Sequence, residues 1–127
     1  MAVDDLRKSD MMSHLLDALE EKKDIGHYGR LVFVMVARHF LSQQEVIQYL
    51  QKDHDFSEAD AKSLYQQVTD KNYSPPQRDS ILEWQQSQDF TICPNADDPD
   101  ACNVYQDLQF PKEVYEQISA YYEEKQS

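Results

Sequence analysis

Apolar residues recur along most of the chain at the three- and four-residue spacing of amphipathic α-helices. Between residues 10 and 26 they fall on one helical face, which carries Met11, Met12, Leu15, Leu16 and Leu19. Ser9 or Asp10 can cap the start of this helix, and Gly26 suits its end. The pattern therefore predicts a helix that buries one side.

Residues 31–37 differ because this apolar run has no polar face. Its three valines would also suit a buried strand, and periodicity alone does not decide between the two. We expect a helix, over about 28–40, because the rest of the chain is helical in pattern and no partner strand is evident. A helix that is apolar nearly all round is buried, so this one should form the centre of the fold.

Three more helices are predicted from capping boxes, in which a serine accepts a hydrogen bond from an amide one turn on and the third residue reaches back. The boxes pair Ser42 with Glu45, Ser57 with Asp60 and Ser74 with Gln77. They start helices at about 43–52, 58–71 and 75–88, the last with Pro75 at its first position.

Two helices are expected in the remainder of the chain. A short one begins at Pro99, capped by Asp98, and the last runs from Pro111 to about Glu124. The fold class is thus all-α: a compact bundle of six or seven short helices around the buried helix at 28–40. We expect one domain over 1–127, with an Asp/Pro-rich loop at 89–101 that lies on the surface as an appendage.

Composition narrows the class of protein. Only 2 of the 127 residues are glycine, which disfavours hairpin-rich β folds and excludes a Gly-rich phosphate loop. The formal charge of −12 argues against direct binding to nucleic acid or an anionic membrane. The longest apolar run is far shorter than a membrane helix, and the N-terminus has no signal-peptide pattern. A cytoplasmic protein is therefore expected.

Cys93 and Cys102 are the two cysteines, and eight residues rich in Asp and Pro separate them. This spacing excludes a C-x-x-C motif, and no second pair completes a zinc site, so neither a metal nor another cofactor is expected. Two interpretations stay open. Both residues can be reduced thiols packed as small hydrophobic side chains, or they can form a redox-responsive pair, because a short segment can bring them together.

Residues 93–107 also resemble a known motif. The order Cys93, eight residues, Cys102, then Tyr105 and Asp107 is similar to the C-terminal cysteine hairpin of the Calvin-cycle redox linker protein of cyanobacteria and chloroplasts. In that family a thioredoxin-controlled disulfide lets the linker bridge glyceraldehyde-3-phosphate dehydrogenase and phosphoribulokinase. The resemblance implies that Cys93 and Cys102 would be the switch, with Tyr105 and Asp107 on the docking segment.

Basic residues interrupt the apolar central helix, where His27, Arg30 and Arg38 lie on one stripe. In so acidic a chain we expect ion pairs to carboxylates on neighbouring helices. The alternative is a site for an anion or an acidic partner at the start of the helix, where backbone amides are free.

No serine or cysteine lies in a nucleophile motif, and the four histidines lack metal-binding spacing, so we predict no catalytic residues and no enzyme. The first hypothesis is a non-enzymatic protein-interaction or regulatory module that acts through its C-terminal third. Its partner is another protein or a second copy of the chain, and its candidate partner-binding residues are Arg30, Trp84, Tyr105 and Asp107. The alternatives are a thiol–disulfide switch at the cysteines, an acidic DNA mimic that inhibits a nucleic-acid-binding protein, and a small enzyme with an unfamiliar site.

Overall fold

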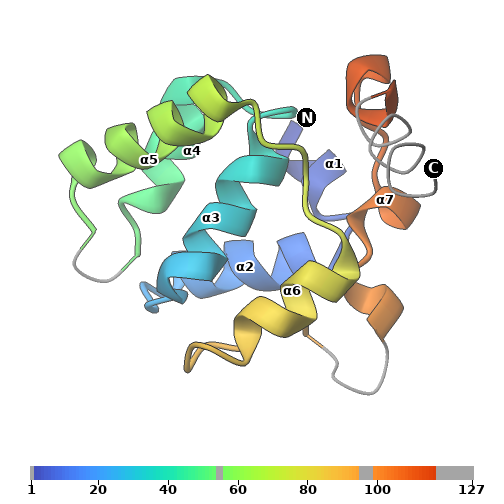
Figure 1. The fold of residues 1–127 in the computed structure, drawn as a ribbon. Coiled ribbons are helices and arrows are strands. Elements are labelled where there is room, and N and C mark those ends of the chain that lie inside the picture. The colour runs from blue at the N-terminus through green and yellow to red at the C-terminus, as the bar shows by residue number, and fades with distance from the viewer. Residues whose placement is uncertain (1, 54–55, 95–98, 117–127) are drawn as a thin grey trace.

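A computed structural model of the chain describes residues 2–53, 56–94 and 99–116 (Figure 1). These residues form helices and no strand. The elements are α1 (Ala2–Leu6), α2 (Asp10–Glu20), α3 (Gly26–Ala37), α4 (Gln43–Leu50), α5 (Glu58–Lys71), α6 (Arg78–Gln85), the 3-10 helix η1 (Pro99–Cys102) and α7 (Val104–Asp107). Residues 112–116 are also helical. The predicted all-α fold is confirmed.

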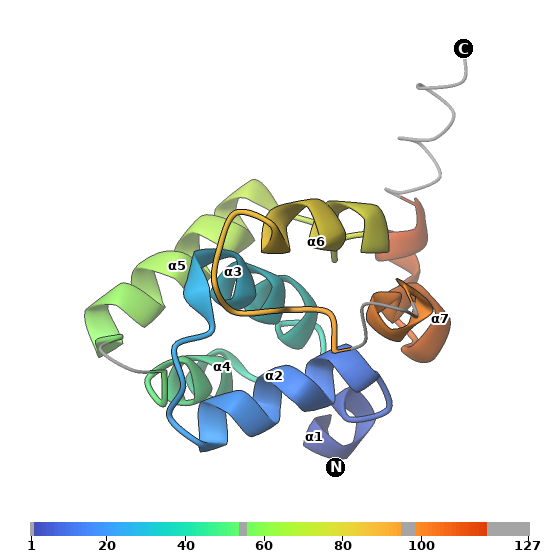
Figure 2. The same cartoon turned by 90° about the horizontal axis from the view of Figure 1, so that it is seen from below.

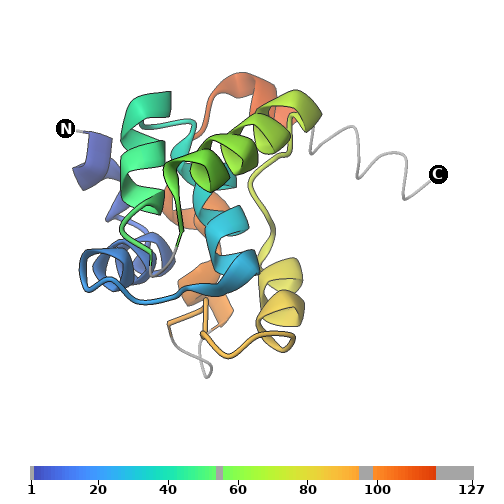
Figure 3. The ribbon, with the colours of Figure 1, turned by 90° about the vertical axis from the view of Figure 1, so that its left-hand side faces the viewer.

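The central helix is α3, which contacts α2, α4, α5 and α6 (Figures 1 and 2). Every residue from Val32 to Ala37 is buried, as expected of a segment without a polar face. Figure 3 shows α4 and α5 side by side along α3, with α6 at another side of it. The apolar run that also suited a strand is therefore a buried helix. Burial of apolar side chains is in general the dominant favourable contribution to folding, and this segment belongs to the hydrophobic core.

Serine caps start three helices as predicted. The Ser9 hydroxyl accepts a hydrogen bond from the Met12 amide at the start of α2. At α4 the Ser42 hydroxyl accepts from the Glu45 amide at 3.2 Å, and a Glu45 carboxylate oxygen accepts from the Ser42 amide at 3.0 Å. The same reciprocal box forms between Ser57 and Asp60 at α5.

The third predicted box, at Ser74, is wrong. Helix α6 begins at Arg78 with Gln77 as its N-cap, so Pro75 is not its first residue. The reason is the sequence Pro75-Pro76, because a residue that precedes proline is held away from the helical region. Both prolines are instead buried in a connection without regular secondary structure between α5 and α6.

The predicted role of Gly26 is also wrong. Helix α2 ends at Glu20, and Lys22 takes the left-handed conformation that follows it, with φ +60°. Gly26 is the first residue of α3, with φ +77°. A Cβ atom there would lie 2.5 Å from the side-chain oxygen of Gln88, so the glycine serves long-range packing at the start of α3.

Other boundaries differ where the local pattern is short. Helix α1 was not predicted, and the single helix expected from Pro99 is instead two, η1 and α7, which meet at Asn103. The Asp98 cap and the part of the last helix beyond residue 116 lie outside the described residues. Within the described part of the chain, no helix is both long and apolar enough to cross a membrane.

Candidate functional site

The structure brings the two cysteines together. Cys93 lies in the segment after α6, and Cys102 is the last residue of η1, which packs against α2 and α6. Both side chains are completely buried thiols, and a hydrogen bond links them. The spacing of eight residues thus allows direct contact between the two sulfur-bearing side chains.

The environment of this thiol pair corrects one expectation. The loop at 89–101 was predicted to be a surface appendage, but its ends belong to the hydrophobic core, where Ile92 and Cys93 lie on one side and Ala101 and Cys102 on the other. The Gln85 side-chain oxygen accepts a hydrogen bond from the Cys93 amide at 2.9 Å and fixes the first end. Burial of apolar side chains at both ends explains the difference, because an extended loop would leave them in water.

Burial also sets the reactivity of the thiols. It raises the pKa of Cys102 to about 12, and the hydrogen bond and charge of Cys93 add to this rise. The positive charge of Arg78 acts in the opposite direction but is the smaller effect. Because the thiolate is the reactive form, Cys102 is inert as a nucleophile while it stays buried.

Arg30 forms the ion pairs expected of it. Its guanidinium donates to Asp53 at 3.3 Å and to Asp24 at 3.1 Å, and it lies 4.5 Å from the centre of the Phe56 ring. The Asp53 side chain is fully buried, and burial raises the pKa of this carboxyl, against the opposing effects of the Ile25 amide and Arg30. Arg30 therefore holds a buried carboxylate within the fold.

The backbone amides at the start of α3 are also used internally. Asp53 accepts from the Ile25 amide, Asp24 from the Gly26 amide and Gln88 from the Tyr28 amide. The alternative of an anion site at this helix start is not supported, because side chains of the chain itself take these amides.

The predicted ion pair of Arg38, at the other end of the basic stripe, is wrong. Arg38 donates to the Asn72 side-chain oxygen and the Tyr73 carbonyl, both at 3.0 Å, and these are neutral acceptors. Burial lowers the pKa of the Arg38 guanidinium. The pKa of His39 is lowered to about 4, first by burial of the ring and then by the positive charge of Arg38. His27 is exposed and packs edge-on against Tyr28.

The four predicted partner-binding residues lie on three different helices. Arg30 is at the start of α3, and Trp84 on α6 is half-buried and stacks on Tyr28 with ring centres 5.5 Å apart. Tyr105 and Asp107 both lie on α7. The Tyr105 hydroxyl donates to the Pro75 carbonyl, and Asp107 lines a hollow between α7 and α1. Only the last two share an element.

Sequence reasoning missed an aromatic cluster centred on Phe110. The rings of His39, Phe40, Tyr105 and Tyr115 all pack around it, with centres 5.4 to 6.5 Å away. The Tyr115 hydroxyl accepts a hydrogen bond from the Phe110 amide at 3.1 Å, while 40% of Tyr115 remains exposed. Phe110 precedes Pro111 between two helices, so it belongs to no periodic apolar pattern. The number of aromatic residues nearby is the one sequence signal that could have indicated the cluster.

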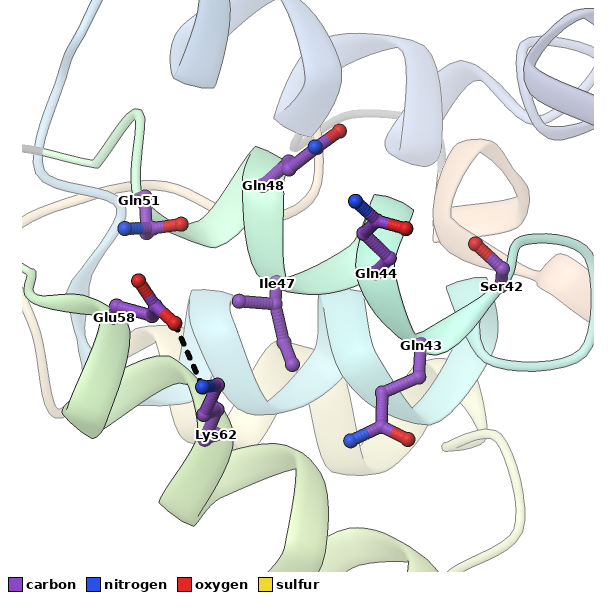
Figure 4. Close-up of a pocket in the computed structure, with 8 residues that line it drawn as sticks. All are labelled: Ser42, Gln43, Gln44, Ile47, Gln48, Gln51, Glu58 and Lys62. Atoms are coloured by element: carbon purple, nitrogen blue, oxygen red, sulfur yellow. Dashed lines mark ion pairs between the residues drawn. The ribbon is translucent and has the colours of Figure 1, made fainter.

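Two surface hollows accompany these features. The larger, of about 580 Å³, lies between α4 and α5 (Figure 4). Four glutamine side chains line it, with Ile47 between the two helices and the Glu58–Lys62 ion pair of 2.7 Å on α5. The hydrogen bond and charge of Lys62 lower the pKa of Glu58. This hollow offers carboxamide hydrogen bonds and little net charge.

The second hollow, of about 490 Å³, is lined by α1, α7 and the residues beside them. In the parts of the chain that the structure describes, no group of three histidine, cysteine or acidic side chains could hold a metal ion. No protein-family model, no curated protein and no solved structure matches the chain. Its function must therefore be inferred from its own surfaces.

Proposed function

We propose that this chain is a non-enzymatic regulatory module, cytoplasmic in location, that binds another protein through its C-terminal third, residues 85–127. The observation that carries the proposal is Tyr115, an exposed aromatic side chain held in a fixed position. Its hydroxyl is tied to the Phe110 amide and its ring packs on the Phe110 ring. A rigid, amphipathic ring of this kind gives a large contact area at low entropic cost and is enriched in protein interfaces.

Charge supports the same region and indicates the nature of the partner. Residues 85–127 contain nine acidic and two basic side chains, a formal charge of −7 out of −12 for the whole chain. Glu113 and Glu116 lie beside Tyr115 and are exposed. A basic protein surface would be attracted to this third of the chain, and the attraction would speed association at low salt.

Affinity capture from an extract of the source organism tests the proposal. The wild-type chain is compared with Tyr115→Ala and with the double charge reversal Glu113→Lys, Glu116→Lys. Tyr73→Ala is the matched control, because Tyr73 is also a large exposed aromatic residue, at 37%, but lies outside the C-terminal third. We expect a partner that the control variant retains and the two test variants lose.

Other outcomes separate the alternatives. Equal retention by all variants, or recovery of no specific partner, contradicts the proposal. If the partner binds nucleic acid and duplex DNA displaces it, the chain is a DNA mimic in which carboxylates stand in for phosphates. If the chain captures only itself, the C-terminal third is a dimer interface.

The contact between Cys93 and Cys102 favours a second candidate, a thiol–disulfide switch. With glutathione disulfide as the oxidant, the two cysteines lose two protons and two electrons and form one S–S bond, while the oxidant is reduced to two thiols. Because both thiols are buried and the pKa of Cys102 is about 12, the reaction requires the segment around Cys93 to open. Closing the loop would then restrict the unfolded chain and stabilise the oxidised form.

Mass spectrometry tests this switch. After incubation with glutathione disulfide, we expect an intramolecular bond in the wild type, formed faster in denaturant concentrations just below the unfolding transition. In Cys93→Ser the same treatment should leave Cys102 slow to form a mixed disulfide. A wild-type chain that gains no bond, or that carries glutathione at each cysteine separately, would exclude the switch.

A further inference from the structure

The hollow between α1 and α7 has the chemistry of a site for a positively charged side chain. Asp5 and Asp107 supply carboxylates from its two sides, and Phe40 and Leu108 supply apolar surface. Its volume of about 490 Å³ is within the range of sites that hold small ligands. We propose that this hollow receives a lysine or arginine side chain of a partner protein, an inference that rests on the proposed function.

The charge of the hollow favours a cation over an anion. The side chains that line it include two carboxylates, Asp5 and Asp107, and one base, Lys8. The Lys8–Asp5 contact of 3.5 Å joins side chains that are 70% and 53% exposed, so it is weak and readily exchanged.

The apolar lining suits the stem of a long basic side chain. Phe40 is half-buried and its ring is held against Phe110, with ring centres 5.5 Å apart and planes at 65°. Leu108 is nearly buried and also lines the hollow. The methylene groups of lysine or arginine pack on such surfaces while their charged ends reach polar groups, as long basic side chains do elsewhere in proteins.

The chain itself shows this mode of recognition twice. Arg30 lies 4.5 Å from the centre of the Phe56 ring while it pairs with Asp53 and Asp24. Lys52 lies 4.9 Å from the centre of the Tyr49 ring while it pairs with Glu20. The hollow contains the same combination of an aromatic ring and carboxylates.

The position of the hollow links it to the proposed binding surface. Phe40 and Tyr115 both pack on Phe110, so the hollow and the exposed tyrosine flank the same aromatic residue. A basic segment of a partner that covers Tyr115 can therefore place one side chain in the hollow. This would fix the register of the partner and supply specificity beyond general charge attraction.

Binding of a short lysine-containing peptide, measured by calorimetry at low ionic strength, tests the site. The probes are this peptide and a counterpart in which the lysines are acetylated, which keeps the stem and removes the charge. The variants are Asp107→Asn, Asp5→Asn and Phe40→Leu, and the control is Glu83→Gln, which removes an exposed carboxylate on α6. Circular dichroism and the melting temperature of each variant establish that it is folded.

We expect the lysine peptide to bind and the acetylated peptide to bind at least about tenfold more weakly. Asp107→Asn and Asp5→Asn should each weaken binding several-fold, Phe40→Leu should weaken it independently of net charge, and Glu83→Gln should have little effect. If Glu83→Gln weakens binding as much as Asp107→Asn, or no folded pocket variant differs from wild type, the site does not exist. A captured partner that binds normally to the pocket variants would overturn this site but leave the proposed function intact.

Discussion

The side chain of Gln88 binds the backbone of Tyr28 and thereby completes the start of the central helix. Its Oε1 atom accepts from the Tyr28 amide at 2.9 Å, and its Nε2 atom donates to the Ile25 carbonyl at 2.9 Å. Ile25, the N-cap residue of α3, has no side-chain group that could do this. Because the first amides of a helix lack partners within it, a residue 60 positions away satisfies one that the local sequence leaves open.

Replacement of Gln88 by alanine should lower the free energy of unfolding by about 1–3 kcal/mol, because a half-buried amide and a carbonyl both lose their partners. Urea unfolding followed by circular dichroism measures the loss. Gln86→Ala is the matched control, since Gln86 is exposed and two residues away. An equal loss in both variants would show that Gln88 does not hold α3.

Gly26→Ala should also destabilise the fold, by more than about 1 kcal/mol, because φ is +77° and the new Cβ would lie 2.5 Å from Gln88 Oε1. Combined with Gln88→Ala, its effect should be smaller than the sum of the two single losses, since the second substitution removes the atom that clashes. Thermal unfolding of the two single variants and the double variant measures this coupling. Strict additivity would contradict it.

Arg30→Gln should cost about 3 kcal/mol at neutral pH, because it leaves the Asp53 carboxylate buried without its counter-charge. Lys52→Gln, which breaks the more exposed pair with Glu20, should cost less than about 1 kcal/mol. Burial already raises the pKa of Asp53, so this group favours the folded state as pH falls and its carboxyl takes up a proton. The Arg30→Gln loss should therefore shrink at acidic pH, and a pH-independent loss would refute this account of the pair.

His39 should make stability depend on pH in the opposite direction. Its folded-state pKa of about 4 lies below its ordinary value of 6.5, chiefly because the ring is buried, and its Nε2 atom has no hydrogen-bond partner. The unfolded chain thus binds more protons between these values, and the contribution of His39 is lost as pH falls from 6.5 towards 4. After allowance for solvent screening, we expect this contribution of His39 to the free energy of unfolding to be about 1–2 kcal/mol.

The non-titrating variant His39→Gln should remove this part of the pH dependence, whereas His27→Gln, at an exposed histidine, should leave it unchanged. Urea unfolding at a series of pH values compares the two variants with wild type. Parallel profiles for wild type and His39→Gln would show that His39 does not contribute.

Local sequence signals predicted the elements whose causes are local. The boxes at Ser42 and Ser57 and the apolar run at 31–37 depend on residues within one or two turns, and all three predictions are confirmed. The predicted capping box at Ser74 is wrong because Pro76 holds the preceding Pro75 away from the helical conformation. The prediction that Gly26 ends a helix is wrong because this glycine packs against Gln88, which lies 62 residues later in the chain.

The candidate sites divide in the same way. The spacing of Cys93 and Cys102 allowed contact between them, but it carried no information on the burial of both loop ends in the core. The cluster around Phe110 contains rings from the residues that follow α3, from α7 and from residue 115, so it exists only once these segments pack together. Long-range packing of this kind has no periodic signature in sequence.

Hydrogen–deuterium exchange of the chain, with and without its captured partner, tests the central claim most directly. Binding through the C-terminal third should slow exchange of the backbone amides at residues 104–116. Exchange in α4 and α5, which form the glutamine-lined hollow, should be unchanged. Slower exchange confined to α4 and α5, with none at 104–116, would contradict the account.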